Sequence, residues 1–444
     1  MPILLFLGVF LYSGLSPRSN SFDSRWSVYI AMSLWNHGST YLDDYSRPIL
    51  ADNYYALECV DAQGHVRRGP PEHCDGHWYS SYPVGGPVLA APLVIAAVGI
   101  LKLAQPVLGL FHPAHPVLSG FLRADYDFGH PLIELEVASI FLAATAVLIY
   151  LIARRFLDQH KAILLTILFA AATPAYSVLG RGLWQHTPST LFLALTIYLL
   201  LGAEERPALA GWAGLPVALS YAVRPTDAIF VLIFTGYVGA RHRRYFLHYL
   251  VAATPVAILF FAYNFSVYHQ PFSPYYQTRL YGFKPEYWPV YGEALAANLI
   301  SPSRGWFIFT PVFLLSAWSM LRGAWTTPLS RWLAAIAVLQ WVAVSGYISN
   351  WWAGMCYGPR FLSDLTPIFT LFLIPYFQKW NALSRGLRNA FVALALIGWI
   401  LNLRGGWSIA VYQWNVDPVS IDKHPERNWD WSDPPFLRWR VKDL

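Results

Sequence analysis

Carboxylates that could do chemistry stand in the first polar stretch of this 444-residue chain. Asp23 follows an apolar run, and the adjacent pair Asp43 and Asp44 lies further on. A fixed carboxylate can take the proton of an attacking hydroxyl, and two adjacent carboxylates can bind a cation or shape a polar cleft. Both sites also have a plain structural interpretation: Asp23 is placed to cap a helix, and the pair is typical of a solvated turn.

Arginines near the ends of apolar runs are the candidates for binding a phosphate, because the planar guanidinium can form two parallel charge-assisted hydrogen bonds with it. The candidates in this chain are Arg47, Arg181, Arg224, Arg279, Arg304 and Arg360. Arg304 and Arg360 rank first, since each lies among glycines and aromatic residues. Arg224 precedes Asp227 by three residues, so a local ion pair explains it equally well.

His186 and several tyrosines could contact a substrate from the same polar stretches. His186 could hydrogen-bond an acceptor or a phosphate, and a satisfied structural histidine at a membrane edge is an equal alternative. Tyr79 and Tyr82 precede the second apolar run, and Tyr357 precedes Arg360. Such rings can line a sugar site, or they can belong to the aromatic belt of a membrane protein.

Three cysteines are present, and two of them share one polar segment. Cys59 and Cys74 are fifteen residues apart, whereas Cys356 stands alone. The spacing fits no zinc ligand set. The pair can form a disulfide if the segment faces an oxidising compartment, and two free thiols are the alternative.

The composition indicates the class of protein that must position these side chains. The chain is 56% hydrophobic and only 13% charged, whereas a soluble domain is about a quarter charged. An all-α polytopic membrane protein is predicted, since about 20 apolar residues form one helical crossing. A disordered chain and a coiled coil are excluded, and the net charge of +6 forms no nucleic-acid-binding stripe. The candidate spans are 2–16, 86–104, 106–122, 132–153, 162–179, 187–203, 208–223, 225–240, 246–265, 306–321, 332–349, 364–377 and 389–403.

We expect 11–13 spans, and the range comes from region 86–122, which is either two spans broken at Gln105-Pro106 or one re-entrant piece. The apolar N-terminus lacks the basic start and the cleavage site of a signal peptide, so it is predicted to stay as the first span. The positive-inside rule places three basic linkers in the cytoplasm: 154–161, 241–244 and 379–388. With two spans in 86–122 and a cytoplasmic N-terminus, all three fall on that side.

Residues 1–404 are therefore predicted to form one transmembrane domain with its polar parts outside. These parts are a first loop at 17–85, a second loop at 266–305 and a short extracytoplasmic tail at 405–444. The first loop contains a predicted juxtamembrane helix at 23–37, stopped by Gly38, whose tryptophan-rich face suits the membrane interface. No cytoplasmic linker is long enough for a nucleotide-binding domain, so any chemistry occurs on the outer face without ATP.

The first 205 residues resemble the GT-C glycosyltransferases, especially the branch that holds the protein O-mannosyltransferases and the lipid A aminoarabinose transferases. In that branch an aspartate heads a juxtamembrane helix, followed by an arginine, an aromatic residue, an alanine and a glycine. The counterparts here are Asp23, Arg25, Trp26, Ala31 and Gly38. A proline-rich entry to the next span and a later Arg-Arg linker also occur here, at 82–87 and 154–157.

Two features depart from that branch. Its members usually carry a second acidic residue where this chain has Gln185 and His186. Many of them also have a large outer domain in place of the short tail. The role of the first aspartate is therefore carried over to Asp23, whereas that of the second acidic site is not.

The resemblance implies a GT-C fold and an enzyme that moves a sugar from a polyprenyl-phosphate donor to a hydroxyl of a glycan, lipid or protein acceptor. Phosphate already leaves readily, so the chemistry needs a base for the acceptor, and Asp23 fits. A single carboxylate suits an inverting, in-line reaction, whereas two close carboxylates would suggest retention. We expect the first loop, the second loop and residues 351–360 to wall one cleft. The expected substrate-binding residues are Arg25, Asp43, Asp44, Tyr79, Tyr82, Arg181, His186, Arg224, Arg304, Tyr357 and Arg360.

No cofactor is required by this chemistry, although Asp43 and Asp44 leave a divalent cation open. We expect a multi-pass protein of the plasma (inner) membrane whose active site faces the extracytoplasmic side. The main alternative is a transporter or flippase of lipid-linked saccharides. Transporters place ionisable groups at the bilayer midplane, and few charges lie in mid-span here, which favours the enzyme.

Overall fold

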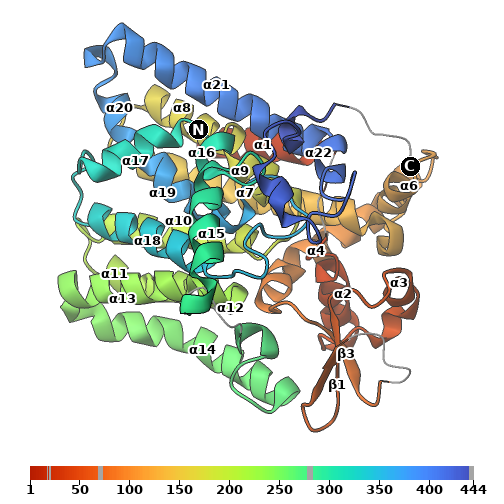
Figure 1. The fold of residues 1–444 in the computed structure, drawn as a ribbon. Helices are drawn as coiled ribbons and strands as arrows, with labels where there is room; N and C mark the ends of the chain where they lie inside the picture. Colours follow the sequence, from red (N-terminus) through yellow and green to blue (C-terminus); the bar gives the residue numbers. More distant parts are fainter. Residues whose placement is uncertain (18, 20–21, 69–73, 278–283, 440–444) are drawn as a thin grey trace.

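The computed structural model describes residues 1–17, 19, 22–68, 74–277 and 284–439 (Figure 1). About 68% of the described residues are helical, and several helices are long and apolar enough to cross a bilayer, which confirms the predicted all-α class of polytopic membrane protein. Most long helices run in roughly one direction as a bundle, whereas the strands gather with α2 and α3 at one end of the molecule (Figure 1).

Length and apolar composition together identify five candidate spans among the described residues: Gly85–Leu103, Tyr126–Ala153, Arg243–Tyr268, Arg360–Gln378 and Arg385–Trp407. A sixth results if Gln159–Ala171 and Pro174–Arg181, bent by 43° at their junction, count as one. The expected 11–13 full-length spans exceed this number. Proline is one reason, because it interrupts the helical hydrogen bonds: Pro311 stands between two short helices where one run was predicted.

The bundle surrounds an apolar core in which α7 packs against α1, α8 and α10. Leu142, Ile149 and Phe169 are fully or almost fully buried in it. The bundle elements are α1 (Pro2–Gly14), α7 (Tyr126–Ala153), α8 (Gln159–Ala171), α9 (Pro174–Ser177), α10 (His186–Gly202), α11 (Leu209–Trp212), α12 (Gly214–Val223), α13 (Ala228–Arg241), α14 (Phe246–Tyr268), α16 (Trp306–Phe309), α17 (Phe313–Leu321), α18 (Ser330–Ser345), the 3₁₀ helix η8 (Arg360–Leu365), α19 (Thr366–Leu371), α20 (Ile374–Gln378) and α21 (Arg385–Trp407).

Region 86–122 contains one long helix, so of the two alternatives for this region the structure contradicts the pair of spans. α4 (Gly85–Leu103) is followed by two short helices, α5 (Gln105–Leu108) and α6 (Pro116–Leu122), and neither is long enough to cross a bilayer. The Gln105 side chain donates to the Leu122 carbonyl at 2.6 Å, so residues 105–122 return to where they began.

The contact between α1 and α7 indicates on which side of the bundle the first polar segment lies. A Cβ built on Gly14, at the end of α1, would lie 2.8 Å from the carboxylate of Glu136, in the first half of α7. The segment between the two helices therefore begins and ends on one side of the bundle. α7 then carries the chain to the opposite side, where the basic linker at 154–161 follows.

The first polar segment folds into a small unit of helices and strands that was not predicted. It comprises α2 (Ser27–His37), the 3₁₀ helix η1 (Asp43–Tyr45), α3 (Ser46–Ala51) and the strands β1 (Leu57–Val60), β2 (Val66–Arg68) and β3 (His77–Ser80). The strands form an antiparallel sheet in the order β2-β1-β3. Cys59 of β1 forms a disulfide with Cys74, with 5.7 Å between their Cα atoms. Of the two alternatives for these cysteines, the structure has the bonded one.

The juxtamembrane helix α2 ends as predicted, at Gly38 in the left-handed conformation (φ 65°). Two other expectations for it are wrong. Asp23 lies in the turn before the helix and does not cap it, because the N-cap position is occupied by Trp26. Trp26 and Ile30, each 1% exposed, are buried within the first polar segment and do not face the membrane interface.

The second loop and the tail are also structured. Residues 266–305 contain the 3₁₀ helices η5 (Pro274–Gln277) and η7 (Pro285–Tyr287) and the helix α15 (Trp288–Ile300). The tail contains α22 (Ala410–Gln413), η10 (Pro425–Trp429) and η11 (Pro435–Leu437). Trp414 and Ile421 of the tail are buried against Trp351 and Trp352. The tail is thus packed onto the bundle.

Candidate active site

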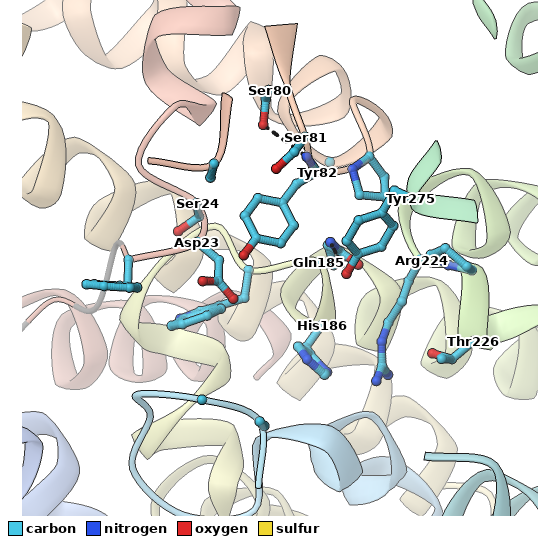
Figure 2. Close-up of a pocket in the computed structure, with 18 of the residues that line it drawn as sticks. Asp23, Ser24, Ser80, Ser81, Tyr82, Gln185, His186, Arg224, Thr226 and Tyr275 are labelled. Atoms are coloured by element: carbon cyan, nitrogen blue, oxygen red, sulfur yellow. Dashed lines mark hydrogen bonds between the residues drawn. The ribbon is translucent and has the colours of Figure 1, made fainter. Parts of the chain in front are cut away.

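A cavity of about 1040 Å³ lies where the bundle meets the first polar segment. The first loop, the second loop and residues 353–361 all contribute to its lining, together with the starts of α10 and α13 and the end of α18. All three polar regions that were expected to wall one cleft are therefore present. Figure 2 shows side chains from these segments converging on one space: Asp23, Tyr82, Gln185, His186, Arg224 and Tyr275.

Both carboxylate oxygens of Asp23 have partners in this cavity. The Arg360 guanidinium donates from Nη1 to Oδ2 at 2.7 Å, and the Tyr55 hydroxyl donates to Oδ1 at 2.9 Å. The side chains of Arg360 and Asp23 are only 11% and 17% exposed. Asp23 is therefore held at a fixed position, with its charge matched by one cation.

The turn that carries Asp23 is anchored on the bundle by its neighbour. Ser24 donates to Oε2 of Glu134 in α7 at 2.7 Å, and the buried Glu134 also lies 3.5 Å from the Leu183 backbone nitrogen, which donates to the same oxygen. The indole of Trp26 donates to the Tyr55 carbonyl at 2.8 Å. These bonds connect the Asp23 turn both to α7 and to the loop before α10.

Arg360 enters the cavity from the first position of η8. Gly358, two residues earlier, has a backbone φ of 76°, a conformation that residues other than glycine adopt only with strain. Pro359 follows it. The guanidinium lies 4.2 Å from the ring centroid of Trp184, a cation–π contact. Within the described part of the chain its Nε is buried without a hydrogen-bond partner.

A second charged cluster lies deeper in the same cavity wall. Asp364 of η8 is completely buried, lies 3.0 Å from Nδ1 of His186 through Oδ1, and pairs with Arg224. Arg224 is also 4.0 Å from Asp227, and Asp227 accepts from the Ser189 hydroxyl. His186 and Arg224 line the cavity, whereas the acidic partners lie behind them.

Tyrosines form much of the remaining wall. Burial, and then the nearby Asp23 carboxylate, raise the pKa of both Tyr55 and Tyr82, so both hydroxyls stay protonated at neutral pH. Burial likewise raises the pKa of Tyr275, whose hydroxyl accepts from the Gln185 side chain at 3.1 Å. The cavity thus combines neutral hydroxyl donors, flat aromatic faces and one carboxylate–guanidinium pair.

Comparison with known proteins gives a match, to a family model. Residues 133–267 match the family model of the dolichyl-phosphate-mannose-protein mannosyltransferases, a stretch that covers less than a third of the chain and runs from α7 to the end of α14. No curated protein and no solved structure matches the chain significantly. The chain is a membrane glycosyltransferase of the GT-C type. The cavity described above is its candidate active site.

Four predicted substrate-binding residues of this glycosyltransferase line the cavity together with Asp23: Tyr82, His186, Arg224 and Arg360. Among the other arginines, Arg181 is fully buried and donates to backbone and hydroxyl oxygens of Ser13, Tyr176 and Ser16. Arg304 is 1% exposed and donates to the carbonyls of Trp352 and Gly354 and to Asn415. Neither arginine lines the cavity, and each joins separate segments of the chain by donating to their oxygens.

The remaining predicted residues of the glycosyltransferase also lie outside the cavity lining. Arg25 pairs with Asp52 and lies over the Tyr55 ring, so it supports the Asp23 turn from behind. Tyr357 is 1% exposed, and its hydroxyl donates to the Leu401 carbonyl at 2.7 Å. Tyr79 belongs to β3, next to the residues of that segment that do line the cavity. Arg47 lies over Phe128, and Arg279 falls outside the described residues.

The acidic pair Asp43 and Asp44 is engaged within the first polar segment. Asp43 accepts from the Trp78 backbone at 2.8 Å and pairs with His77, whereas Asp44 lies 2.9 Å from Nε2 of His37. Neither carboxylate lines the cavity. Among the described residues no group of three or more His, Cys, Asp or Glu side chains could hold a metal ion. The pair therefore organises the fold of this segment, away from the cavity in which it was expected.

Sequence reasoning missed three residues of the site. Tyr55, which bonds to Asp23, gives no local signal beyond its place in a tyrosine pair after Asn53. Trp184 faces Arg360 from the loop before α10. Asp364 stands four residues after Arg360, at the start of an apolar run. An acidic residue at the edge of such a run is a signal for a functional partner, and it could have identified Asp364.

Proposed function

We propose that this glycosyltransferase transfers a sugar from a polyprenyl-phosphate donor to an acceptor hydroxyl, with inversion, and that Asp23 is the general base. The Asp23–Arg360 pair in the cavity is the observation that carries the proposal. A carboxylate and a guanidinium side by side are the two groups that this reaction needs, one for the incoming proton and one for the departing phosphate.

In the proposed reaction the acceptor oxygen attacks the anomeric carbon while the bond from that carbon to the phosphate oxygen breaks. The proton of the acceptor goes to Asp23, and the bonding electron pair leaves with the phosphate. Arg360 holds the phosphate, using donors such as Nε that have no partner among the described residues. Tyr55 keeps Asp23 oriented by donating to the oxygen that Arg360 does not contact.

The geometry also supports an order of events. In the structure the Arg360 guanidinium occupies Oδ2 of Asp23, so this oxygen is not open to an acceptor until the pair separates. An incoming donor phosphate competes for the guanidinium and thereby releases Asp23 toward the acceptor. Base activation then depends on donor binding, which limits wasteful proton transfer at the empty site.

Two carboxylates line the described part of the cavity, Asp23 and Asp422, and only Asp23 is placed beside a cation, which favours inversion over retention. Asp422 is exposed and accepts from the Trp352 indole at 2.8 Å. Asp23 is the half-buried carboxylate beside a cation, so we assign the base to it alone. The donor, a polyprenyl-phosphate sugar, and the acceptor, a glycan, lipid or protein, would meet on the extracytoplasmic side of the plasma membrane.

The test is turnover of radiolabelled polyprenyl-phosphate mannose in membranes that contain the chain, read as release of polyprenyl phosphate and transfer of label. Asp23→Asn should lower turnover by about 10²–10⁴-fold, because the amide cannot accept the proton. Asp75→Asn is the matched control, since Asp75 is an exposed carboxylate of the same segment outside the cavity lining. Near-normal turnover in Asp23→Asn, with the variant inserted in the membrane like the parent, would contradict the proposal.

A further inference from the structure

His186 and Asp364 form a pair that the transfer reaction as proposed does not use. Nδ1 of His186 lies 3.0 Å from Oδ1 of Asp364, and the His186 side chain is 6% exposed whereas that of Asp364 is fully buried. Figure 2 shows the imidazole of His186 in the cavity between Asp23 and Arg224. The ring also lies near-parallel to Phe361, at 6.5 Å between centroids. His186 is thus held on one edge and presents its other edge to the substrate space.

The partners of Asp364 determine where the imidazole proton lies. Asp364 pairs with the Arg224 guanidinium, which favours its ionised form, and an ionised carboxylate can only accept hydrogen bonds. Nδ1 of His186 must therefore carry a proton. The other charged groups near the ring are Arg224, whose second acidic neighbour is Asp227, and Arg360, which is paired with Asp23. A buried imidazole beside the Arg224 guanidinium favours the neutral form, which leaves Nε2 without a proton.

The unprotonated Nε2 restricts what this edge of His186 can bind. A phosphodiester carries no proton, so its oxygens and the Nε2 lone pair would repel one another. A sugar hydroxyl can donate to Nε2. Resting on the proposed function, we propose that His186, with Asp364 as its positioning residue, forms a subsite for one hydroxyl of the donor sugar, separate from the phosphate subsite at Arg360.

Asp364→Asn is the decisive substitution, because the amide has one acceptor and one donor end. Arg224, a permanent cation, would keep the amide oxygen, so the NH₂ group would face Nδ1 of His186. Nδ1 must then be unprotonated, and the proton moves to Nε2. The substitution nearly conserves volume but changes the Nε2 edge from a hydrogen-bond acceptor to a donor.

The first measurement is ¹⁵N NMR of the histidine side chains of the full chain in nanodiscs, with His186→Phe identifying the His186 signals. We expect a protonated Nδ1 and an unprotonated Nε2 in the parent, and the reverse in Asp364→Asn. Asp227→Asn removes a buried acid beside Arg224 that does not contact His186, so the His186 signals should keep the parent pattern. A protonated Nε2 in the parent, in either the neutral or the charged ring, would overturn the proposal.

The second measurement uses short-chain polyprenyl-phosphate mannose and its monodeoxy analogues as donors. In the parent, one analogue should lose about tenfold in kcat/KM, the effect of one missing hydrogen bond to a buried group. His186→Phe should turn over that analogue and the full sugar equally well. Equal loss for every analogue in both proteins would overturn the subsite and leave Asp23 as the base untouched. The NMR experiment does not require the protein to turn over a donor. It therefore tests the state of His186 even if the proposed reaction is wrong.

Discussion

At the scale of single residues, the charges of the site are arranged in pairs. Asp23 is paired with Arg360, and Arg224 is paired with Asp364. Truncating one member of a buried pair leaves an uncompensated charge and destabilises a protein by about 3–5 kcal/mol. A substitution that keeps the charge therefore separates the chemistry from the stability of the fold better than an alanine does.

Arg360→Lys is such a substitution. Lysine can still neutralise Asp23, but it lacks the planar fork that binds a phosphate with two parallel bonds. We expect the KM for the donor to rise and turnover to fall, together by on the order of tenfold or more in kcat/KM. Steady-state kinetics with the labelled donor measures this, and Arg67→Lys, an exposed residue outside the cavity lining, is the control. Parent-like constants for both Arg360→Lys and Arg360→Ala would make Arg360 an ordinary structural residue.

Local sequence predicted the residues of the site that stand beside a break in an apolar run. Asp23, Arg360 and His186 are of this kind. The same signal could not separate Arg360 from Arg181 or Arg304, because all three are arginines at such edges. The three arginines differ in which oxygen atoms they contact. Those atoms belong to segments far away in the sequence, and only folding brings them close.

At the scale of elements, the active-site turn depends on α7. Glu134 accepts from Ser24 and from the Leu183 backbone, so it joins the turn before α2 to the loop before α10. Glu134→Gln keeps an acceptor oxygen at the same place and should stay within about twofold of the parent. Glu134→Leu leaves both donors without that partner and should lower kcat by about tenfold, with little change in donor affinity. Equal kcat in the leucine variant and the parent would show that the turn is held by other contacts.

The disulfide stabilises the first polar segment at the same scale. Cys59 and Cys74 close a loop of fifteen residues, for which the loop-entropy model gives about 3 kcal/mol. We expect the double variant Cys59→Ser, Cys74→Ser to be cut faster by a protease within this segment, and reductant to have the same effect on the parent. Maleimide labelling before and after reduction measures the bond itself. Full labelling of both thiols without reductant would contradict it.

Apolar runs predicted where most helices lie, but not which of them continue unbroken. The run 106–122 looks like a span in the sequence, but in the structure α6 packs against α7 and the Gln105 side chain donates to the Leu122 carbonyl. The strands of the first polar segment were missed because each is only three or four residues long. Strands that short carry little periodic pattern, and here pairing and the disulfide hold them together.

At the scale of the whole molecule, the cavity and the basic linkers lie at opposite ends of the bundle helices. Gly14 at the end of α1 and Glu136 in the first half of α7 lie next to each other, on the side of the Asp23 turn. The linker at 154–161 follows the other end of α7. By the positive-inside rule we expect the cavity to face away from the cytoplasm. Composition predicted the membrane class, whereas the sidedness stays a prediction from the charges of the linkers.

Cysteine labelling tests the sidedness. The native cysteines should not react with a maleimide, since Cys59 and Cys74 form a disulfide and Cys356 is buried. On intact cells a membrane-impermeant maleimide should label Gln63→Cys, an exposed position in the first polar segment. His160→Cys, exposed in the basic linker, should react only after permeabilisation. The reverse pattern would place the cavity in the cytoplasm and exclude the proposed extracytoplasmic reaction.

The most direct test of the account is a structure of the chain in nanodiscs with a polyprenyl phosphate bound. We predict that the phosphate oxygens lie about 3 Å from the Arg360 guanidinium, and that Asp23 has left Arg360 and faces the open cavity. A phosphate bound elsewhere, with Asp23 and Arg360 still 2.7 Å apart, would contradict the claim that this pair is the catalytic centre.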